Sequence, residues 1–382
     1  MSFSSHPALR IDDIELKIPI IQGGMGVGIS LSRLASAIAN QGGVGVIATA
    51  GIGYLEPDFM TDLKSATRRA LKKEIVKARE MTDGVVGVNV MLALTDYKSL
   101  ITTAVDSGID IVFLSAGLPF RLPGELNVEY MNDSGAKFVP IVSSARAAKL
   151  LLTKWNKMDY PPDAIVIEGP LAGGHLGFSR SQLDDREFTL EKIFRETREF
   201  VDSFEQKHGR KVPLIVAGGI FSGGDIYKFL EMGADGVQMA TRFVGTFECD
   251  ADDNFKQRYI ECRMEDLTII DSPVGLPGRA INNKFIRQIR DGIMKPYECP
   301  WQCLKTCDVT NAPYCIAKAL TEAKYGNFED GFAFAGSNAY KIKKIVHVKE
   351  LIESLDREYN RAAESVSMKE GEVQGNSLAR DM

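Results

Sequence analysis

The segments LIVAGGI at residues 214–220 and GVQMATRF at residues 236–243 decide the fold class of this chain. Each begins with a short run of apolar residues and then passes into small residues. Such runs predict buried strands that end in tight turns, and the amphipathic stretch at 224–232 is long enough for a helical crossover between them. Parallel strands joined by a helix are the repeating unit of α/β proteins.

The same alternation extends back to the N-terminus and predicts a (β/α)₈ TIM barrel over about residues 15–250, the usual size of that fold. The expected strands lie at 19–22, 44–49, 85–90, 109–115, 137–142, 164–168, 213–217 and 236–239. The expected helices between them lie at 31–41, 58–82, 96–107, 145–155, 190–207 and 224–232.

An open, doubly wound sheet is the main alternative to a barrel. Its signature is a glycine-rich turn after the first strand, with an acidic residue about 20 residues further on. GGMGVG at 23–28 matches that turn only approximately, and residues 48–50 offer no acid at the end of the second strand. The barrel is therefore favoured.

Beyond residue 250 the alternation stops, which predicts a chain of three parts. Residues 1–250 form the barrel, residues 251–364 a helical extension that covers it, and the polar residues 365–382 a disordered tail. Within the extension we expect a loop-like segment at 266–283 and helices at 284–294, 316–325 and 347–363.

Composition excludes several classes of protein. Of 382 residues, 45% are hydrophobic and 25% charged, which is typical of a globular protein. Lys and Arg total 46 against 51 Asp and Glu, a net charge of −5, and no basic patch suggests nucleic-acid binding. No apolar run of about 18 residues and no secretory signal are visible, so we expect a cytoplasmic protein that does not enter membranes.

The loop EGPLAGGHLG at 168–177 carries the strongest candidate for catalysis. His175 lies among glycines after the sixth strand, at the end of the barrel where active sites are built. An imidazole with a pKa near 6.5 can donate or accept a proton near neutrality, whereas His6, His208 and His347 lie in peripheral contexts. Glu168 could ligate a cation, receive the imidazole or merely end the strand.

Glycine turns after the first and seventh strands predict a site where backbone approaches a ligand closely. QGGMG at 22–26 suits a flat cofactor or an anion, although a tight turn alone would also explain it. The turn at 217–220 and the small residues at 238–242 suit a phosphate, because loops after the last two strands of a barrel commonly bind one. SGGD at 222–225 either adds helix-start amides or is only a helix entry with a cap.

Four of the six cysteines crowd into the extension. Cys299, Cys303 and Cys307 are spaced by four residues and Cys315 follows. On a helix this spacing would place the first three on one face, which could hold zinc or an iron–sulfur cluster or could be apolar packing. The spacing differs from the common CxxC metal pattern, so packing or thiol chemistry is favoured and no metal is assigned to the active site.

The motifs PIIQGGMG, GVNVM, AGGHLG, VAGGI and QMATRF, in this order, resemble the nitronate monooxygenase family, formerly 2-nitropropane dioxygenases, and the related FMN-dependent enoyl-ACP reductases. The resemblance implies a barrel with noncovalently bound FMN and His175 as the catalytic residue. Its cofactor-binding positions here would be Gly24, Met25, Asn89, Gly173, Gly174, Ala217, Gly218, Gly219, Gln238, Met239, Ala240 and Thr241. The first three would lie along the flavin, and residues 218–219 and 240–241 would hold its phosphate.

The resemblance also implies a reaction. An alkyl nitronate would lose an electron to the flavin, and after reaction with O₂ a carbonyl compound and nitrite would leave. His175 would steady the nitro group if protonated, or remove the α-proton of a nitroalkane if neutral. The alternative is an enoyl-ACP reductase that passes hydride from NAD(P)H through FMN. The expected partners are a nitronate or nitroalkane and O₂, and a homodimer is left open.

Overall fold

Eight parallel strands form the centre of the molecule. The computed structural model describes residue 3 and residues 8–120, 126–299 and 301–378. The sheet has the order β3-β11-β10-β8-β7-β6-β5-β4. All eight predicted strands are confirmed, as β3 (Ile20–Gln22), β4 (Gly45–Ala48), β5 (Val86–Met91), β6 (Ile111–Ser115), β7 (Lys137–Val142), β8 (Ile165–Glu168), β10 (Leu214–Ala217) and β11 (Gly236–Met239).

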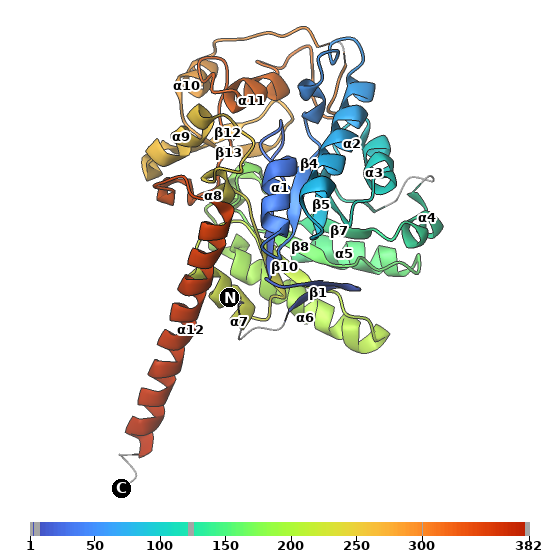
Figure 1. Ribbon diagram of the computed structural model, residues 1–382. Coiled ribbons are helices and arrows are strands. Elements are labelled where there is room, and N and C mark those ends of the chain that lie inside the picture. The colour runs from blue at the N-terminus through green and yellow to red at the C-terminus, as the bar shows by residue number, and fades with distance from the viewer. Residues whose placement is uncertain (1–2, 4–7, 121–125, 300, 379–382) are drawn as a thin grey trace.

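The sheet closes on itself between its two outer strands. Ile21 of β3 forms a parallel bridge with Val44 next to β4. The Gln22 N–H donates to the carbonyl of Val44 at 2.9 Å, and the Val44 N–H donates to the carbonyl of Ile20 at 3.0 Å. The predicted barrel is therefore confirmed, and the open sheet is excluded (Figure 1).

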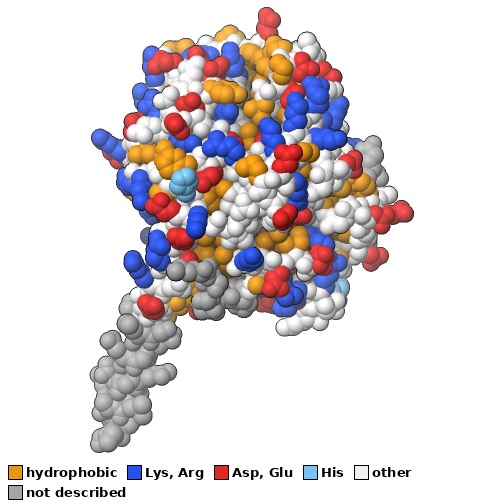
Figure 2. All heavy atoms as spheres, in the orientation of Figure 1, with side chains coloured by type: hydrophobic (Ala, Val, Ile, Leu, Met, Phe, Trp, Pro, Cys, Tyr) orange, Lys and Arg blue, Asp and Glu red, His pale blue; other side chains and the backbone are white. Residues whose placement is uncertain are grey.

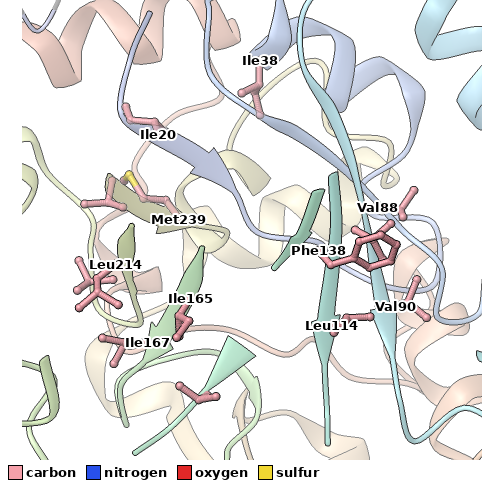
Figure 3. Packing of buried hydrophobic residues seen from close by; sticks show 14 of the residues in the cluster. Ile20, Ile38, Val88, Val90, Leu114, Phe138, Ile165, Ile167, Leu214 and Met239 are labelled. Atoms are coloured by element: carbon pink, nitrogen blue, oxygen red, sulfur yellow. The ribbon is translucent and has the colours of Figure 1, made fainter. Parts of the chain in front are cut away.

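The strands alternate between an inner and an outer core. Outward residues such as Leu114 and Ile165 pack beneath helices together with Ile38 of α1 (Ser32–Ala39), as Figure 3 shows. Inward residues such as Phe113 and Val166 form a separate cluster inside the barrel. Because strand side chains alternate with a period of two, the last inward positions carry the side chains that face the barrel mouth. These are Asn89, Ser115, Glu168 and Gln238.

The six predicted crossover helices are present. Helix α2 (Leu63–Met81) starts five residues after the predicted start of that helix. Asp62 caps it by accepting a hydrogen bond from the Ser65 N–H at 3.0 Å. The remaining barrel helices are α3 (Tyr97–Asp106), α4 (Val128–Asp133), α5 (Ala145–Asn156), α6 (Leu190–His208), α7 (Gly223–Glu231) and α8 (Thr241–Val244).

A hairpin that sequence reasoning did not anticipate joins the inner core. β1 (Leu9–Ile11) and β2 (Ile14–Leu16) pair antiparallel, and their apolar side chains are buried among the inward residues of the barrel. A Cβ added to Gly236, at the start of β11, would lie 2.7 Å from the Leu9 side chain. The hairpin therefore fills the amino-terminal end of the barrel, opposite the mouth.

The prediction of a loop at 266–283 is wrong. This segment contains β12 (Leu267–Asp271) and β13 (Pro277–Ile281), an antiparallel hairpin to which β9 (Gly174–His175) adds a third strand. Pro277 is tolerated because it is the first residue of its strand, where a missing N–H costs little. The extension also contains α9 (Asp253–Glu261), α10 (Lys284–Arg290), α11 (Ile316–Lys324) and α12 (Val348–Leu378).

Helix α12 packs along α7 and α1 and then continues away from the barrel (Figure 1). Leu351, Leu355 and Tyr359 are its buried contacts. The predicted tail would begin at residue 365, but the helix continues to Leu378 without a break there. Residues 379–382 lie outside the described residues, and the division into three parts stays a prediction.

Among the described helices, none combines the length and apolar character needed to cross a bilayer. On the face seen in Figure 2, acidic, basic and apolar side chains are interspersed.

Candidate active site

A cavity of about 980 Å³ opens at the carboxyl ends of the barrel strands. Its wall combines strand-end residues of the barrel with residues of the extension. Met25 is the one predicted site residue that does not line it, because its side chain packs against the hydrophobic core and its N–H donates to Ser30 Oγ at 2.8 Å. The predicted residues that line it are His175, Gly24, Asn89, Gly173, Gly174, Ala217, Gly218, Gly219, Gln238, Met239, Ala240 and Thr241.

The floor of the cavity is polar and tightly packed against the first glycine turn. A Cβ added to Gly24 would lie 2.5 Å from the Asn89 Cβ, so only glycine allows this approach. Asn89 Oδ1 accepts a hydrogen bond from Ser115 Oγ at 2.9 Å. This bond fixes the amide so that its nitrogen is the group left to donate toward a ligand.

The turn after β10 forms a cradle with the start of α8. Gly218 and Gly219 have φ angles of 90° and 93°, a left-handed conformation that favours glycine. The extension braces both sides, since Asn338 Nδ2 donates to the Gly219 carbonyl at 2.7 Å and Thr241 Oγ1 accepts from the Gly336 N–H at 3.0 Å. Within the described part of the chain, the Gly219 N–H has no acceptor. An exposed amide in a glycine turn suits an anion.

The start of α7 does not contribute to this cradle. Ser222 and Asp225 cap the helix reciprocally, with Asp225 Oδ2 accepting from the Ser222 N–H at 2.8 Å. The Gly223 N–H donates to Glu358 Oε2 of α12 at 2.9 Å. Because the amides of Ser222, Gly223 and Asp225 are bonded to protein side chains and none of residues 222–225 lines the cavity, SGGD is a helix entry in this structure.

His175 is held by the hairpin of the extension. It lies in β9, where it pairs with Gly278 of β13. Its Nε2 lies 2.7 Å from Ser272 Oγ, in the turn of that hairpin, and its ring meets the Phe334 ring edge-on at 5.0 Å. Among the described residues, Nδ1 has no hydrogen-bond partner. Nδ1 is therefore the ring nitrogen available to a substrate.

Burial makes the neutral imidazole the resting form. Enclosure by protein lowers the pKa of His175 to about 4, because the charged ring would lose the water that stabilises it. The predicted role as a preformed cation is disfavoured on this ground. A neutral ring can still act as a base or as an N–H donor, and which nitrogen carries the proton depends on the direction of the Ser272 hydrogen bond.

Arg279 is a site residue that sequence reasoning missed. Its buried guanidinium donates from Nη1 to the carbonyls of Pro170 at 2.6 Å and Ala172 at 2.7 Å, within the loop that leads to His175. Burial lowers the pKa of Arg279 by desolvation. Arg279 lies more than 100 residues from Pro170 and Ala172 in the sequence, so no local pattern connects it to the histidine loop. The one local signal of a special role was a charged arginine within the short apolar run GRAI at 278–281.

Glu168 faces the cavity from the end of β8 without a partner. No hydrogen bond or ion pair involves its carboxyl group in the described regions, including none to His175. Desolvation by the surrounding barrel raises its pKa to about 7, which favours the protonated carboxyl group more than in water. One of the three predicted roles of Glu168 was to receive the imidazole of His175, and this contact is absent from the described part of the structure.

The cysteines of the extension gather, but not on a helix. Residues 299 and 301–307 are irregular, so the helical face considered for the first three thiols does not exist. All four line a separate small cavity of about 30 Å³, and each is a free thiol. Burial raises the pKa of Cys303 to about 12. Within the described residues, no group of three or more Cys, His, Asp or Glu side chains could hold a metal ion.

Comparison with known proteins extends these observations over most of the chain. A family model described as nitronate monooxygenase matches residues 8–358. A dehydrogenase of Mycobacterium tuberculosis, named for a 5-hydroxy-7a-methyl-1-oxo-octahydro-1H-indene-4-carboxyl-CoA, is 24% identical over 375 residues, 90% of this chain and 93% of that protein. A probable nitronate monooxygenase of Bacillus subtilis is 24% identical over 371 residues, 89% of this chain and 95% of that protein.

Solved structures show the same architecture. FabK from Thermotoga maritima superimposes with a TM-score of 0.70 at 26% identity, covering 93% of this chain and 96% of that one. The similarity therefore includes the extension as well as the barrel.

Proposed function

The chain belongs to the nitronate monooxygenase family, and on that basis we propose that it is an FMN-dependent cytoplasmic enzyme that oxidises alkyl nitronates with O₂ to carbonyl compounds and nitrite. The observation that carries the proposal is the position of His175. Its Nε2 is fixed by Ser272 at 2.7 Å, while Nδ1 is left without a partner among the described residues in a cavity with a polar floor and an anion cradle.

The residues present fit FMN. The close approach of Gly24 to Asn89 leaves room for a flat ring where any side chain would intrude. The amides of Asn89 and Gln238 suit the hydrogen-bonding edge of the ring, and the turn at Gly218 and Gly219 suits the phosphate. When bound, the flavin supplies the redox chemistry with the substrate and O₂, while the protein supplies orientation and electrostatics.

The neutral ring of His175 has two tautomers, and each one suits a different substrate. If the Ser272 hydroxyl donates to Nε2, the proton of the neutral ring is on Nδ1, which can donate to an oxygen of a nitronate anion. If Nε2–H donates to Ser272, the lone pair of Nδ1 can accept the α-proton of a nitroalkane. The two states are neutral tautomers: passing from one to the other moves the ring proton between Nδ1 and Nε2 by exchange with solvent, and the Ser272 hydroxyl reverses its hydrogen bond to match.

The test starts with the visible spectrum of the purified protein, followed by anaerobic mixing with propyl-2-nitronate or NADPH. We expect a bound flavin that is bleached rapidly by the nitronate and slowly by NADPH. With air admitted, nitrite should form in proportion to nitronate consumed. A protein that neither contains nor takes up FMN would contradict the proposal, as would a flavin that the nitronate leaves oxidised.

A second candidate function is the reduction of the carbon–carbon double bond of an enoyl thioester, as in an FMN-dependent enoyl-ACP reductase that uses NAD(P)H. The specific observation in its favour is the dehydrogenase of a carboxyl-CoA compound that matches 90% of this chain. Rapid bleaching of the flavin by NADPH, with reoxidation by an enoyl thioester, would favour this function over nitronate oxidation.

A further inference from the structure

The cavity has a second half that the proposed cofactor does not explain. In the closed strand order, β10 and β11 stand opposite β5 and β6, so the loops after these two pairs face each other across the mouth. The cradle lies on the first side. On the other side a group of apolar side chains lines the wall beside polar ones such as Asp62, Lys64 and Asp96. We call the part lined by Tyr54, Leu63, Leu94, Trp301, Leu304 and Leu320 the apolar compartment.

The extension builds one wall of the apolar compartment and fixes it to the barrel. Leu304 bridges Leu94 in antiparallel fashion, and the Thr95 N–H donates to the carbonyl of Cys303 at 3.1 Å. Lys305 adds two bonds, from its N–H to the Ala93 carbonyl at 2.9 Å and from Nζ to the Leu92 carbonyl at 2.9 Å. The wall is thus a positioned part of the structure.

Aromatic rings stand at the outer side of this wall. The Trp301 ring lies 6.5 Å from that of Tyr54 and 6.0 Å from that of Phe59, within the range of favourable ring contacts. Leu304 is buried in a cluster with Met91 and Leu94. Side chains of this kind stabilise a ligand mainly through the apolar surface that they remove from water.

The cavity is larger than a small nitronate alone would fill. Its volume of about 980 Å³ is near the upper end of the ~300–1,000 Å³ that ligand pockets span. A contiguous group of apolar side chains beside a site commonly marks the place where a ligand binds. We propose that the apolar compartment binds the hydrocarbon body of the substrate, a medium-length chain, while its reacting carbon lies at His175.

This inference rests on the proposed function only in the identity of the reacting group. Binding of unreactive compounds therefore tests the apolar compartment by itself, and turnover of nitronates tests it together with the proposed function. The chain has two tryptophans, and Trp301 lines the compartment whereas Trp155 is fully buried with its Nε1 donating to the Pro119 carbonyl at 2.7 Å. Unreactive primary alcohols of two to ten carbons serve as probes of the purified protein. Their binding should change the fluorescence of the wild type and of Trp155→Phe, but not that of Trp301→Phe.

Affinity should rise with chain length by about fourfold per methylene, which corresponds to ~0.8 kcal/mol per buried CH₂. Affinity that does not depend on chain length would overturn the inference. So would an unchanged signal in Trp301→Phe, since the alcohols would then bind elsewhere.

The second test compares the turnover of a long and a short nitronate. Trp301→Gln should lower kcat/KM at least tenfold for the nitronate of 1-nitrooctane and less than twofold for that of nitroethane. Met294→Ala, which changes an exposed residue of the same extension outside the cavity, should alter neither value. Equal losses for both nitronates would overturn the inference. If no nitronate reacts but alcohol binding still depends on chain length, the proposed function is contradicted, while binding of a hydrocarbon chain in the apolar compartment is supported.

Discussion

The two sides of the cavity are built by different means. The cofactor side consists of turns that directly follow barrel strands, so its residues are close in sequence to the runs that predict those strands. The side that holds His175 depends on partners far along the chain, since 97 residues separate His175 from Ser272 and 107 separate Ala172 from Arg279. The turns of the proposed cofactor side are therefore supplied by the barrel and only braced by Gly336 and Asn338, whereas the extension itself supplies the partner that aims the histidine.

The substitution His175→Asn should affect the histidine side of the cavity and leave the cofactor side unchanged. Loss of the only ring nitrogen free for substrate should lower turnover by about 10²–10⁴-fold, the usual range for a general acid or base. The flavin content should not change, because the cradle is untouched. Parallel assays of nitrite formation and of the flavin spectrum measure both, and unchanged turnover would remove His175 from catalysis.

Gly24→Val breaks the cofactor side instead. The added Cβ would collide with Asn89 at 2.5 Å, so the turn must shift away from the floor of the cavity. We expect FMN affinity to fall by at least about tenfold, measured by flavin fluorescence during titration of the apoprotein, while the fold survives. Gly224→Val, at the start of α7 where the nearest atom to an added Cβ is Ser222 Oγ at 3.7 Å, is a control for adding a side chain outside the cavity. Full retention of FMN by Gly24→Val would contradict the close fit.

Arg279→Met tests whether the extension acts through position alone. Removal of the guanidinium leaves two buried carbonyls unpaired and should cost about 2–3 kcal/mol of unfolding free energy. Turnover should fall about tenfold as the loop loosens, with kcat affected more than flavin binding. Arg180→Met is the matched control, because its exposed ion pair with Asp271 is worth less than about 1 kcal/mol. Equal losses in both variants would argue against a positioning role.

The smallest expected effect concerns Glu168 and pH. Its pKa is raised to about 7 in the folded protein, so between about pH 4.5 and 7 the folded state keeps a proton that the unfolded state releases. The free energy of unfolding therefore falls as pH rises through this window. In Glu168→Gln that contribution disappears, and the variant should gain stability relative to the wild type between pH 5 and pH 8. Denaturation at both pH values measures this, with exposed Glu80→Gln as a control expected to show no change.

Sequence reasoning reached the features that local patterns encode. Short apolar runs identified every barrel strand, and the glycines around His175 identified the candidate for catalysis. It missed the hairpin at β12 and β13 because Pro273, Gly275, Pro277 and Gly278 make that segment read as a loop, although the pairing with β9 is what orders it. Ser272 and Arg279 gained their roles only from that pairing. The cysteine spacing was misleading because residues 301–307 follow the barrel edge and do not form a helix.

The bracing of the cradle by Gly336 and Asn338 sets an order of events during synthesis. Domains generally fold as units, and N-terminal ones fold first as the chain emerges from the ribosome. The strands and the glycine turn are complete by residue 241, but the residues that close over the turn are made almost 100 residues later. A nascent barrel whose synthesis has not reached residue 336 would therefore present a glycine turn without this bracing.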